Sequence, residues 1–339
     1  MQAATIASQV SLIIPAHKLD TTFQKCLEAL TQFTVCPLEC IIVLDGCTHQ
    51  PSFFPKTNFP VHVLTQPKTS GPAVARNFGA KHAKGNWLLF IDSDVAAPPT
   101  LVEKIAQIIE AYPQFSAFIG SYDDQPEKQH MVSKFRNLLH HWGHQQETTF
   151  EAETFWAGCG IVRKDAFEKV KGFDTSFAKP SIEDIAFGYK LRKAGHTIGL
   201  AKNWQVKHLK YWSLRNMVET DVFARAKPWT KLLHENKSWS QTNLNVKSKE
   251  KLSAVLWTLG GISLGMSAWN VYALLGSILF WSCFLFLQRN TYYFLSKHFR
   301  FWQMPFVFGL HGIYFLSAIT GYALGTLEFW LASSKNHEQ

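Results

Sequence analysis

Charged residues are missing from one long stretch of this 339-residue chain and nearly missing from a second. Residues 252–287 contain no Asp, Glu, Lys or Arg, and residues 301–331 contain one charged side chain, Glu328. A helix that crosses a bilayer needs about 20 consecutive apolar residues. The first stretch has room for a helical hairpin that turns near Trp269-Asn270. We therefore predict a membrane region at residues 252–333 with two or three transmembrane helices. The alternatives are one long tilted span, or helices that associate with the membrane without crossing it.

The sequence also lacks a Cys-x-x-Cys pair and any zinc spacing among its six cysteines. This pattern indicates reduced thiols in a cytoplasmic protein. The first nine residues are polar and lack the apolar core of a secretory signal. We therefore expect a multi-pass membrane protein whose catalytic domain lies on the cytoplasmic side.

Positive charge is concentrated in the middle of the chain. Residues 190–251 contain fourteen Lys and Arg against four Asp and Glu, a balance of +10, while the whole chain carries +9. A basic segment beside an apolar one is typical of a cytoplasmic surface that meets anionic lipid. Nucleic acid is the competing partner for a basic patch, but it does not explain the apolar stretches. We predict a basic juxtamembrane segment at residues 241–251, a membrane partner and no nucleic acid.

The first hundred residues alternate between short apolar runs and helical periodicity. Buried strands are predicted at residues 10–14, 40–44, 61–64 and 87–91, and helices at 23–33, 71–84 and 101–111. This alternation predicts an α/β fold with a Rossmann-like, mostly parallel sheet flanked by helices. Ligands bind at the carboxyl ends of such strands, so His17, Asp45 and Asp92 should share one rim.

The remaining part of the first 240 residues continues the pattern. A helix is predicted at residues 182–194 and a last strand at 197–201. Residues 212–226 form an amphipathic helical pattern that Pro228 interrupts. Such a helix lies on a bilayer surface or on the surface of an ordinary globular domain, and the pattern fits both.

Asp92-Ser93-Asp94 is the strongest local signal for chemistry. Two carboxylates one residue apart, on a turn that leaves a strand, provide the oxygen ligands that Mg²⁺ or Mn²⁺ prefers and shares with substrate phosphates. The competing interpretation is an ordinary solvated turn. Asp45 ends another strand, where a carboxylate accepts a hydrogen bond from a nucleobase. Gly71 opens a helix whose N-terminus favours anions, and Arg76 either reaches a phosphate or forms a salt bridge at the rim.

Several segments together resemble the successive blocks of family 2 glycosyltransferases. They are Ser11-Leu-Ile-Ile-Pro-Ala16, Ile41-Ile-Val-Leu-Asp-Gly46, Gly71-Pro-Ala-Val-Ala-Arg-Asn77, Leu88-Leu-Phe-Ile-Asp-Ser-Asp94, Trp156-Ala-Gly-Cys-Gly160, Gly172-Phe-Asp174, Glu183-Asp184 and Leu191-Arg-Lys-Ala-Gly195. The order matches the family, and the resemblance covers residues 8–232. It implies a GT-A fold over residues 1–240, a UDP- or GDP-sugar donor and inversion at the anomeric carbon.

The resemblance also implies roles for individual residues. Asp184 is expected to be the catalytic base, supported by Glu183; the competing interpretation is that both only begin a helix. Asp92 and Asp94 are expected at the metal, and His208 is either a third ligand or a plain surface histidine. The donor nucleotide is expected to contact Pro15, Ala16, His17, Asp45, Gly71, Arg76, Asp92 and Ser93. The first block has Pro15-Ala-His17 where the family usually has an aromatic residue and Asn, so the nucleobase stays open.

The resemblance to family 2 glycosyltransferases, together with the apolar stretches, predicts transfer of a single sugar to a membrane lipid acceptor. The Gln-x-x-Arg-Trp signature of processive polysaccharide synthases is missing, and Arg225-Ala-Lys-Pro-Trp229 does not match it. Two alternatives remain: a processive polysaccharide synthase subunit, or a non-catalytic membrane assembly protein that retains the fold. The intact Asp92, Asp94 and Asp184 argue against the second.

Overall fold

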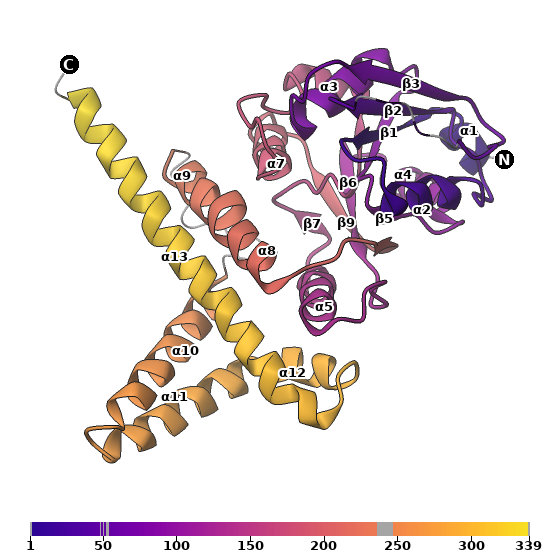
Figure 1. Ribbon diagram of the computed structural model, residues 1–339. Coiled ribbons are helices and arrows are strands. Elements are labelled where there is room, and N and C mark those ends of the chain that lie inside the picture. Colours follow the sequence, from indigo (N-terminus) through magenta and orange to yellow (C-terminus); the bar gives the residue numbers. More distant parts are fainter. Residues whose placement is uncertain (1, 48, 50, 52–53, 236–246, 338–339) are drawn as a thin grey trace. The chain divides into compact units, whose positions relative to one another are not determined.

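The computed structural model describes residues 2–47, 49, 51, 54–235 and 247–337 (Figure 1). The chain divides into two compact units. Unit 1 consists of Met1–Gln129 and Gly143–Tyr211, and unit 2 of His130–Trp142 and Trp212–Gln339.

A mixed sheet forms the centre of unit 1. Within the described residues its strand order is β3-β2-β1-β4-β8-β6-β9-β5, with β7 beside β9. The strands are β1 (Val10–Ala16), β2 (Glu39–Asp45), β3 (Val61–Gln66), β4 (Trp87–Ile91), β5 (Val95–Ala96), β6 (Ala117–Tyr122), β7 (Glu151–Ala152), β8 (Cys159–Arg163) and β9 (Ile198–His208). The four strands predicted in the first hundred residues are all present.

The sheet is parallel in its first half and mixed in its second. Strand β1 pairs in parallel with β2 and β4, and β2 with β3. Strand β8 runs antiparallel to both β4 and β6, so the predicted mostly parallel sheet is correct only for the first half. Pro15 does not end β1 as predicted. The pairing of β1 with β4 stops at Ile13, whereas its pairing with β2 continues to Ala16, so the strand extends along one neighbour.

Helices cover both faces of this sheet, as the alternation predicts (Figure 1). They are α1 (Gln2–Ala7), α2 (Thr21–Leu30), α3 (Pro72–His82), α4 (Leu101–Ala111), α6 (Lys164–Lys169) and α7 (Glu183–Lys193). One core packs α2 and α4 against the even-numbered residues of β1, and a second core packs α3 and α7 against Ile13. Successive side chains of a strand point to opposite faces of the sheet, so neighbouring residues of β1 belong to different cores.

Unit 2 is helical in its described part. Its elements are α5 (Met131–Gln145, whose last residues belong to unit 1), α8 (Leu214–Glu219), the π-helix η1 (Thr220–Ala226), α9 (Lys227–Glu235), α10 (Ser248–Met266), α11 (Tyr272–Leu287), α12 (Arg289–Ser296), the 3₁₀ turn η2 (Phe301–Gln303) and α13 (Met304–His337). Pro228 does not interrupt the amphipathic helix as predicted. The wide π turn just before it accommodates the ring, which would clash with the carbonyl four residues back in a regular α-helix.

The apolar stretches form fewer potential spans than predicted. Residues 252–287 form a hairpin of α10 and α11 that turns at the predicted Trp269-Asn270. Of the described helices, one, at Phe301–Ala332, is long and apolar enough to cross a bilayer. A second span results only if α11 and α12, bent by 75° at their junction, count as one. Residues 241–246 of the predicted juxtamembrane segment 241–251 lie outside the described residues.

Candidate active site

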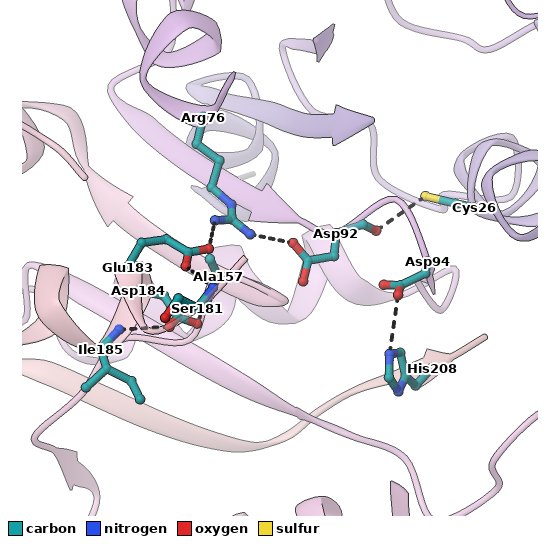
Figure 2. A network of polar contacts seen from close by, with 10 residues as sticks. All are labelled: Cys26, Arg76, Asp92, Asp94, Ala157, Ser181, Glu183, Asp184, Ile185 and His208. Carbon is teal, nitrogen blue, oxygen red and sulfur yellow. Dashed lines mark hydrogen bonds and ion pairs between the residues drawn. The ribbon is translucent and has the colours of Figure 1, made fainter. Parts of the chain in front are cut away.

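The Asp92-Ser93-Asp94 turn links β4 to β5 at the carboxyl end of β4 (Figure 2). The N–H of Val95 donates to the carbonyl of Asp92 at 3.1 Å, which closes the turn. Strand β5 then pairs with the end of β9, and Val95 lies opposite His208. This pairing brings Nε2 of His208 to 3.6 Å from Oδ2 of Asp94. Residues 114 positions apart in the sequence thus lie together because of one short antiparallel pair.

Arg76 connects this turn to the start of α7. Its Nη2 donates to Oδ1 of Asp92 at 2.7 Å and its Nη1 to Oε1 of Glu183 at 2.8 Å. The guanidinium is buried and lies over the ring of Phe173, 5.4 Å from its centroid. Burial opposes the charge, but Asp92 and Glu183 outweigh it and raise the pKa of Arg76. The rim salt bridge considered from the sequence is therefore present.

Asp184 occupies the first turn of α7, beside the Arg76 bridge. Its Oδ2 accepts from the N–H of Ala157 at 3.2 Å and its Oδ1 from the N–H of Ile185 at 2.8 Å. Burial, followed by the negative charge of Glu183, raises the pKa of Asp184 to about 7, although Arg76 acts against this. A carboxyl with a pKa near neutrality is suited to accept a proton during a reaction.

The two aspartates of the turn have different electrostatic environments. Burial and the charge of Asp94 raise the pKa of Asp92 despite its contact with Arg76. For Asp94, burial is outweighed by the hydrogen bond and charge of His208 and by the charge of Lys210, so its pKa is lowered. Asp94 is therefore the more firmly ionised of the two.

Asp45 and Gly71 lie on the same side of the sheet edge. The two carboxylate oxygens of Asp45 accept from the N–H groups of Ser70 and Gly71, at 2.7 and 2.9 Å. Gly71 has a φ of 92°, and a Cβ there would lie 2.6 Å from the carbonyl oxygen of Ala178. Asp45 thus shapes the loop that starts α3, in addition to any role toward a nucleobase.

The first strand contributes its end to this rim. Nδ1 of His17 lies 3.0 Å from the carbonyl oxygen of Asp45. Sγ of Cys47 donates to the carbonyl oxygens of Ala16 and His17 at 3.4 and 3.5 Å. The backbone after Pro15 is therefore connected to the end of β2, as expected for neighbouring parallel strands.

The donor groups of the turn fit a divalent cation that is shared with a substrate. Among the residues described, no three His, Cys, Asp or Glu side chains converge closely enough to hold a metal by themselves. Asp92, Asp94 and His208 nevertheless offer carboxylate oxygens and one imidazole on adjoining backbone segments. Mg²⁺ and Mn²⁺ sites commonly use one or two carboxylates together with substrate phosphates and water. These side chains could therefore hold such a cation only together with oxygens of a substrate.

Two contributors to the site were not predicted from the sequence. Tyr122, at the end of the unpredicted strand β6, stacks on His208. Ala157 donates its backbone N–H to Asp184. The short apolar run Ala117-Phe118-Ile119 was a signal for the strand, whereas a backbone donor leaves no signal in residue identity.

Comparison with known proteins identifies the class. Residues 11–171 match the family described as glycosyl transferase family 2. An uncharacterized glycosyltransferase of Haemophilus influenzae is 30% identical over 219 residues, which cover 63% of this chain and 72% of the relative. The uncharacterized glycosyltransferase YibD of Escherichia coli is 34% identical over 101 residues, 29% of either chain. The fold and these matches define a glycosyltransferase.

A solved structure supports the same fold. The mannosyltransferase PcManGT from Pyrobaculum calidifontis, in complex with GDP-Man and Mn²⁺, superimposes with a TM-score of 0.59 at 14% identity, covering 93% of this chain and 87% of that one. This likeness confirms the predicted GT-A fold. The chain belongs to glycosyltransferase family 2, and it is a transferase.

Proposed function

We propose that the enzyme transfers a single sugar, with inversion, from a UDP- or GDP-sugar to a membrane lipid acceptor. The observation that carries the proposal is the Arg76 bridge, which joins Asp92 of the proposed donor site to Glu183, the neighbour of the proposed base Asp184. One buried guanidinium thus holds the leaving-group side and the proton-accepting side in a fixed relation. Such fixed positioning is what an in-line displacement requires.

The proposed reaction is a single displacement. The acceptor oxygen forms a bond to the anomeric carbon while the bond from that carbon to the diphosphate breaks. The acceptor's hydroxyl proton passes to the carboxylate of Asp184, which Glu183 helps to hold. A pKa of about 7 gives Asp184 the proton affinity for this step and still leaves it partly ionised at neutral pH.

The proposed donor site lies at the carboxyl ends of the parallel strands. It comprises Pro15, Ala16, His17, Asp45, Gly71, Arg76, Asp92 and Ser93. The proposed Mg²⁺ or Mn²⁺ would be held by Asp92, Asp94 and His208 and would neutralise charge on the departing diphosphate. Asp94, with its lowered pKa, is the stronger anionic ligand.

A lipid acceptor is proposed because the chain joins this catalytic part to an apolar one. We assign residues 1–240 to catalysis, 241–251 to a basic juxtamembrane segment and 252–333 to the membrane, with the catalytic domain on the cytoplasmic side. The candidate span and the apolar hairpin support attachment to a bilayer, where a lipid hydroxyl or phosphate would meet the site.

Two measurements test the proposal. Membranes that contain the protein, incubated with radiolabelled UDP- or GDP-sugars, should form an organic-soluble product, and chelation of divalent cations should abolish it. Asp184→Asn should reduce this product about a hundredfold or more, which is the usual contribution of a general base. The matched control is Asp165→Asn, because Asp165 is 66% exposed and pairs with Arg163. Label that appears only in water-soluble product would exclude a lipid acceptor.

A further inference from the structure

The hairpin of α10 and α11 exposes apolar surface over most of its length. Trp269 is 87% exposed and Tyr272 75% exposed at the turn. Further exposed apolar side chains on the two helices are Leu252, Val255, Leu259, Ile262, Leu264, Met266, Leu274, Leu275, Ile278, Leu279, Leu285 and Phe286. Residues 252–287 contain no charged side chain, so water is a poor solvent for this surface.

Several polar groups inside the hairpin have hydrogen-bond partners within it, although Nε1 of Trp257 has none among the described residues. Ser277 donates to the carbonyl of Gly260 at 2.9 Å, and Nε1 of Trp281 to the carbonyl of Trp257 at 3.2 Å. Ser267 donates from its hydroxyl to the carbonyl of Leu264 at 2.7 Å. In hydrocarbon every polar group needs such an internal partner, because no water is present to replace it.

The turn of the hairpin shows the same property in its backbone. Asn270 Oδ1 accepts from the N–H of Tyr272 at 3.0 Å. The N–H groups of five further turn residues donate to carbonyls of the turn or its flanking helices: Ser267, Ala268, Trp269, Asn270 and Ala273. These internal bonds leave fewer backbone donors of the turn in need of water.

The base of the hairpin is polar. Nε2 of the fully buried Gln288 donates to Glu250 at 2.9 Å and to Ser253 at 3.0 Å, and its Oε1 accepts from Thr291 at 2.8 Å. Basic side chains flank this network on both sides: Lys247, Lys249, Lys251, Arg289, Lys297 and Arg300. Both ends of the hairpin therefore carry polar and basic groups of the kind that suits a membrane face with anionic headgroups.

The length of the arms decides how far the hairpin reaches. From Ser253 to Met266 there are thirteen helical steps, about 20 Å, and from Tyr272 to Leu287 fifteen, about 23 Å at 1.5 Å per residue. The hydrocarbon core of a bilayer is about 30 Å thick. We infer that this hairpin inserts into a lipid bilayer with anionic headgroups from one face and returns to the same face. Its tip then lies in the hydrocarbon.

The inference rests on the membrane attachment in the proposed function and is independent of the transfer reaction. The test uses the full chain with Cys36→Ser, Cys47→Ser and Cys283→Ser, which removes the thiols that are not buried. A nitroxide is attached at Val271→Cys in the turn, and in a control protein at Tyr293→Cys on α12; these side chains are 69% and 67% exposed. The vesicles contain phosphatidylcholine with a minor fraction of phosphatidylglycerol.

Collision rates with oxygen and with a membrane-impermeant nickel chelate report the depth of each label. With the chelate outside the vesicles, we expect a nickel collision rate at position 271 about tenfold or more below that at 293. With the chelate sealed inside, we expect no nickel collisions at position 271. Nickel access from outside means that the hairpin is not inserted, and access only from inside means that it crosses; either overturns the inference. Failure of the protein to sediment with vesicles overturns the membrane attachment as well, whereas the other failures leave the proposed function standing.

Discussion

The imidazole of His208 lies parallel to the ring of Tyr122, with centroids 4.1 Å apart and planes 10° apart. Trp156 meets the same phenol ring edge-on, at 4.8 Å and 86°. This packing sets the plane of the imidazole, while its Nε2 faces Asp94 at 3.6 Å. We therefore expect Tyr122 to orient His208 toward the proposed metal site.

Tyr122→Leu should weaken Mn²⁺ binding about tenfold, because groups that orient a metal ligand typically contribute that much or more. Mn²⁺ electron paramagnetic resonance, recorded with the nucleoside diphosphate present, measures the affinity without any turnover. Tyr122→Phe keeps the ring stack and should bind Mn²⁺ as the wild type does. Equal affinities for the Leu and Phe variants would mean that the stack has no part in the metal site.

The metal turn illustrates how far the sequence could predict the site. Asp92 and Asp94 follow an apolar run, and this local pattern was enough to predict their place at a strand end. The proximity of His208 depends on the pairing of the two-residue strand β5 with β9. So short a strand has no periodicity, and only the folded sheet brings the two segments together.

Arg76→Ala should lower the stability of the protein by about 3 kcal/mol or more, because it leaves the partly or fully buried carboxylates of Asp92 and Glu183 without their cation. Arg76→Lys should recover part of the loss, since one ammonium lacks the planar fork that contacts both carboxylates. Thermal unfolding in detergent measures both variants. Arg215→Ala, which removes an exposed pair with Glu219, is the control and should leave the midpoint unchanged. A midpoint for Arg76→Ala equal to that control would show that the bridge contributes nothing to stability.

The bridge itself was only partly predictable. Arg76 was expected either to reach a phosphate or to form a salt bridge, and its residue type allowed both. The choice depends on the approach of α7 to α3, which places Glu183 at 2.8 Å. A contact between residues 107 positions apart follows from the whole packing of the second core, which no local pattern describes.

Gly46→Ala should destabilise the protein more than Gly195→Ala, although both glycines have positive φ, 69° and 85°. A Cβ at Gly46 would lie 2.1 Å from Oγ1 of Thr69, whereas at Gly195 nothing lies within 4 Å. Backbone strain alone costs about 1 kcal/mol, and overpacking adds roughly 1–3 kcal/mol at Gly46. Denaturant unfolding compares the two. Donor affinity should fall only for Gly46→Ala, because the clash displaces the loop that Asp45 holds; similar losses in both variants would contradict this account.

The raised pKa of Asp184 predicts that activity increases and stability decreases as the pH rises. Burial and Glu183 raise its pKa from an ordinary 3.8 to about 7, so kcat/KM should rise about tenfold per pH unit below 7 and level off above it. The unfolded chain loses this proton near pH 4, while the folded protein keeps it until about pH 7. Stability therefore falls as pH rises through this window, because the folded state binds the additional proton.

Asp184→Asn separates the two effects. It removes the base, so the rising limb of activity should disappear together with the activity itself. It also removes the buried charge, so the variant should be more stable than the wild type at pH 8 and differ little from it at pH 4. Thermal midpoints at the two pH values measure this. A variant that is less stable than the wild type at pH 8, or a wild-type activity limb centred below pH 5, would show that the carboxyl of Asp184 has an ordinary pKa and is not the group that accepts the proton.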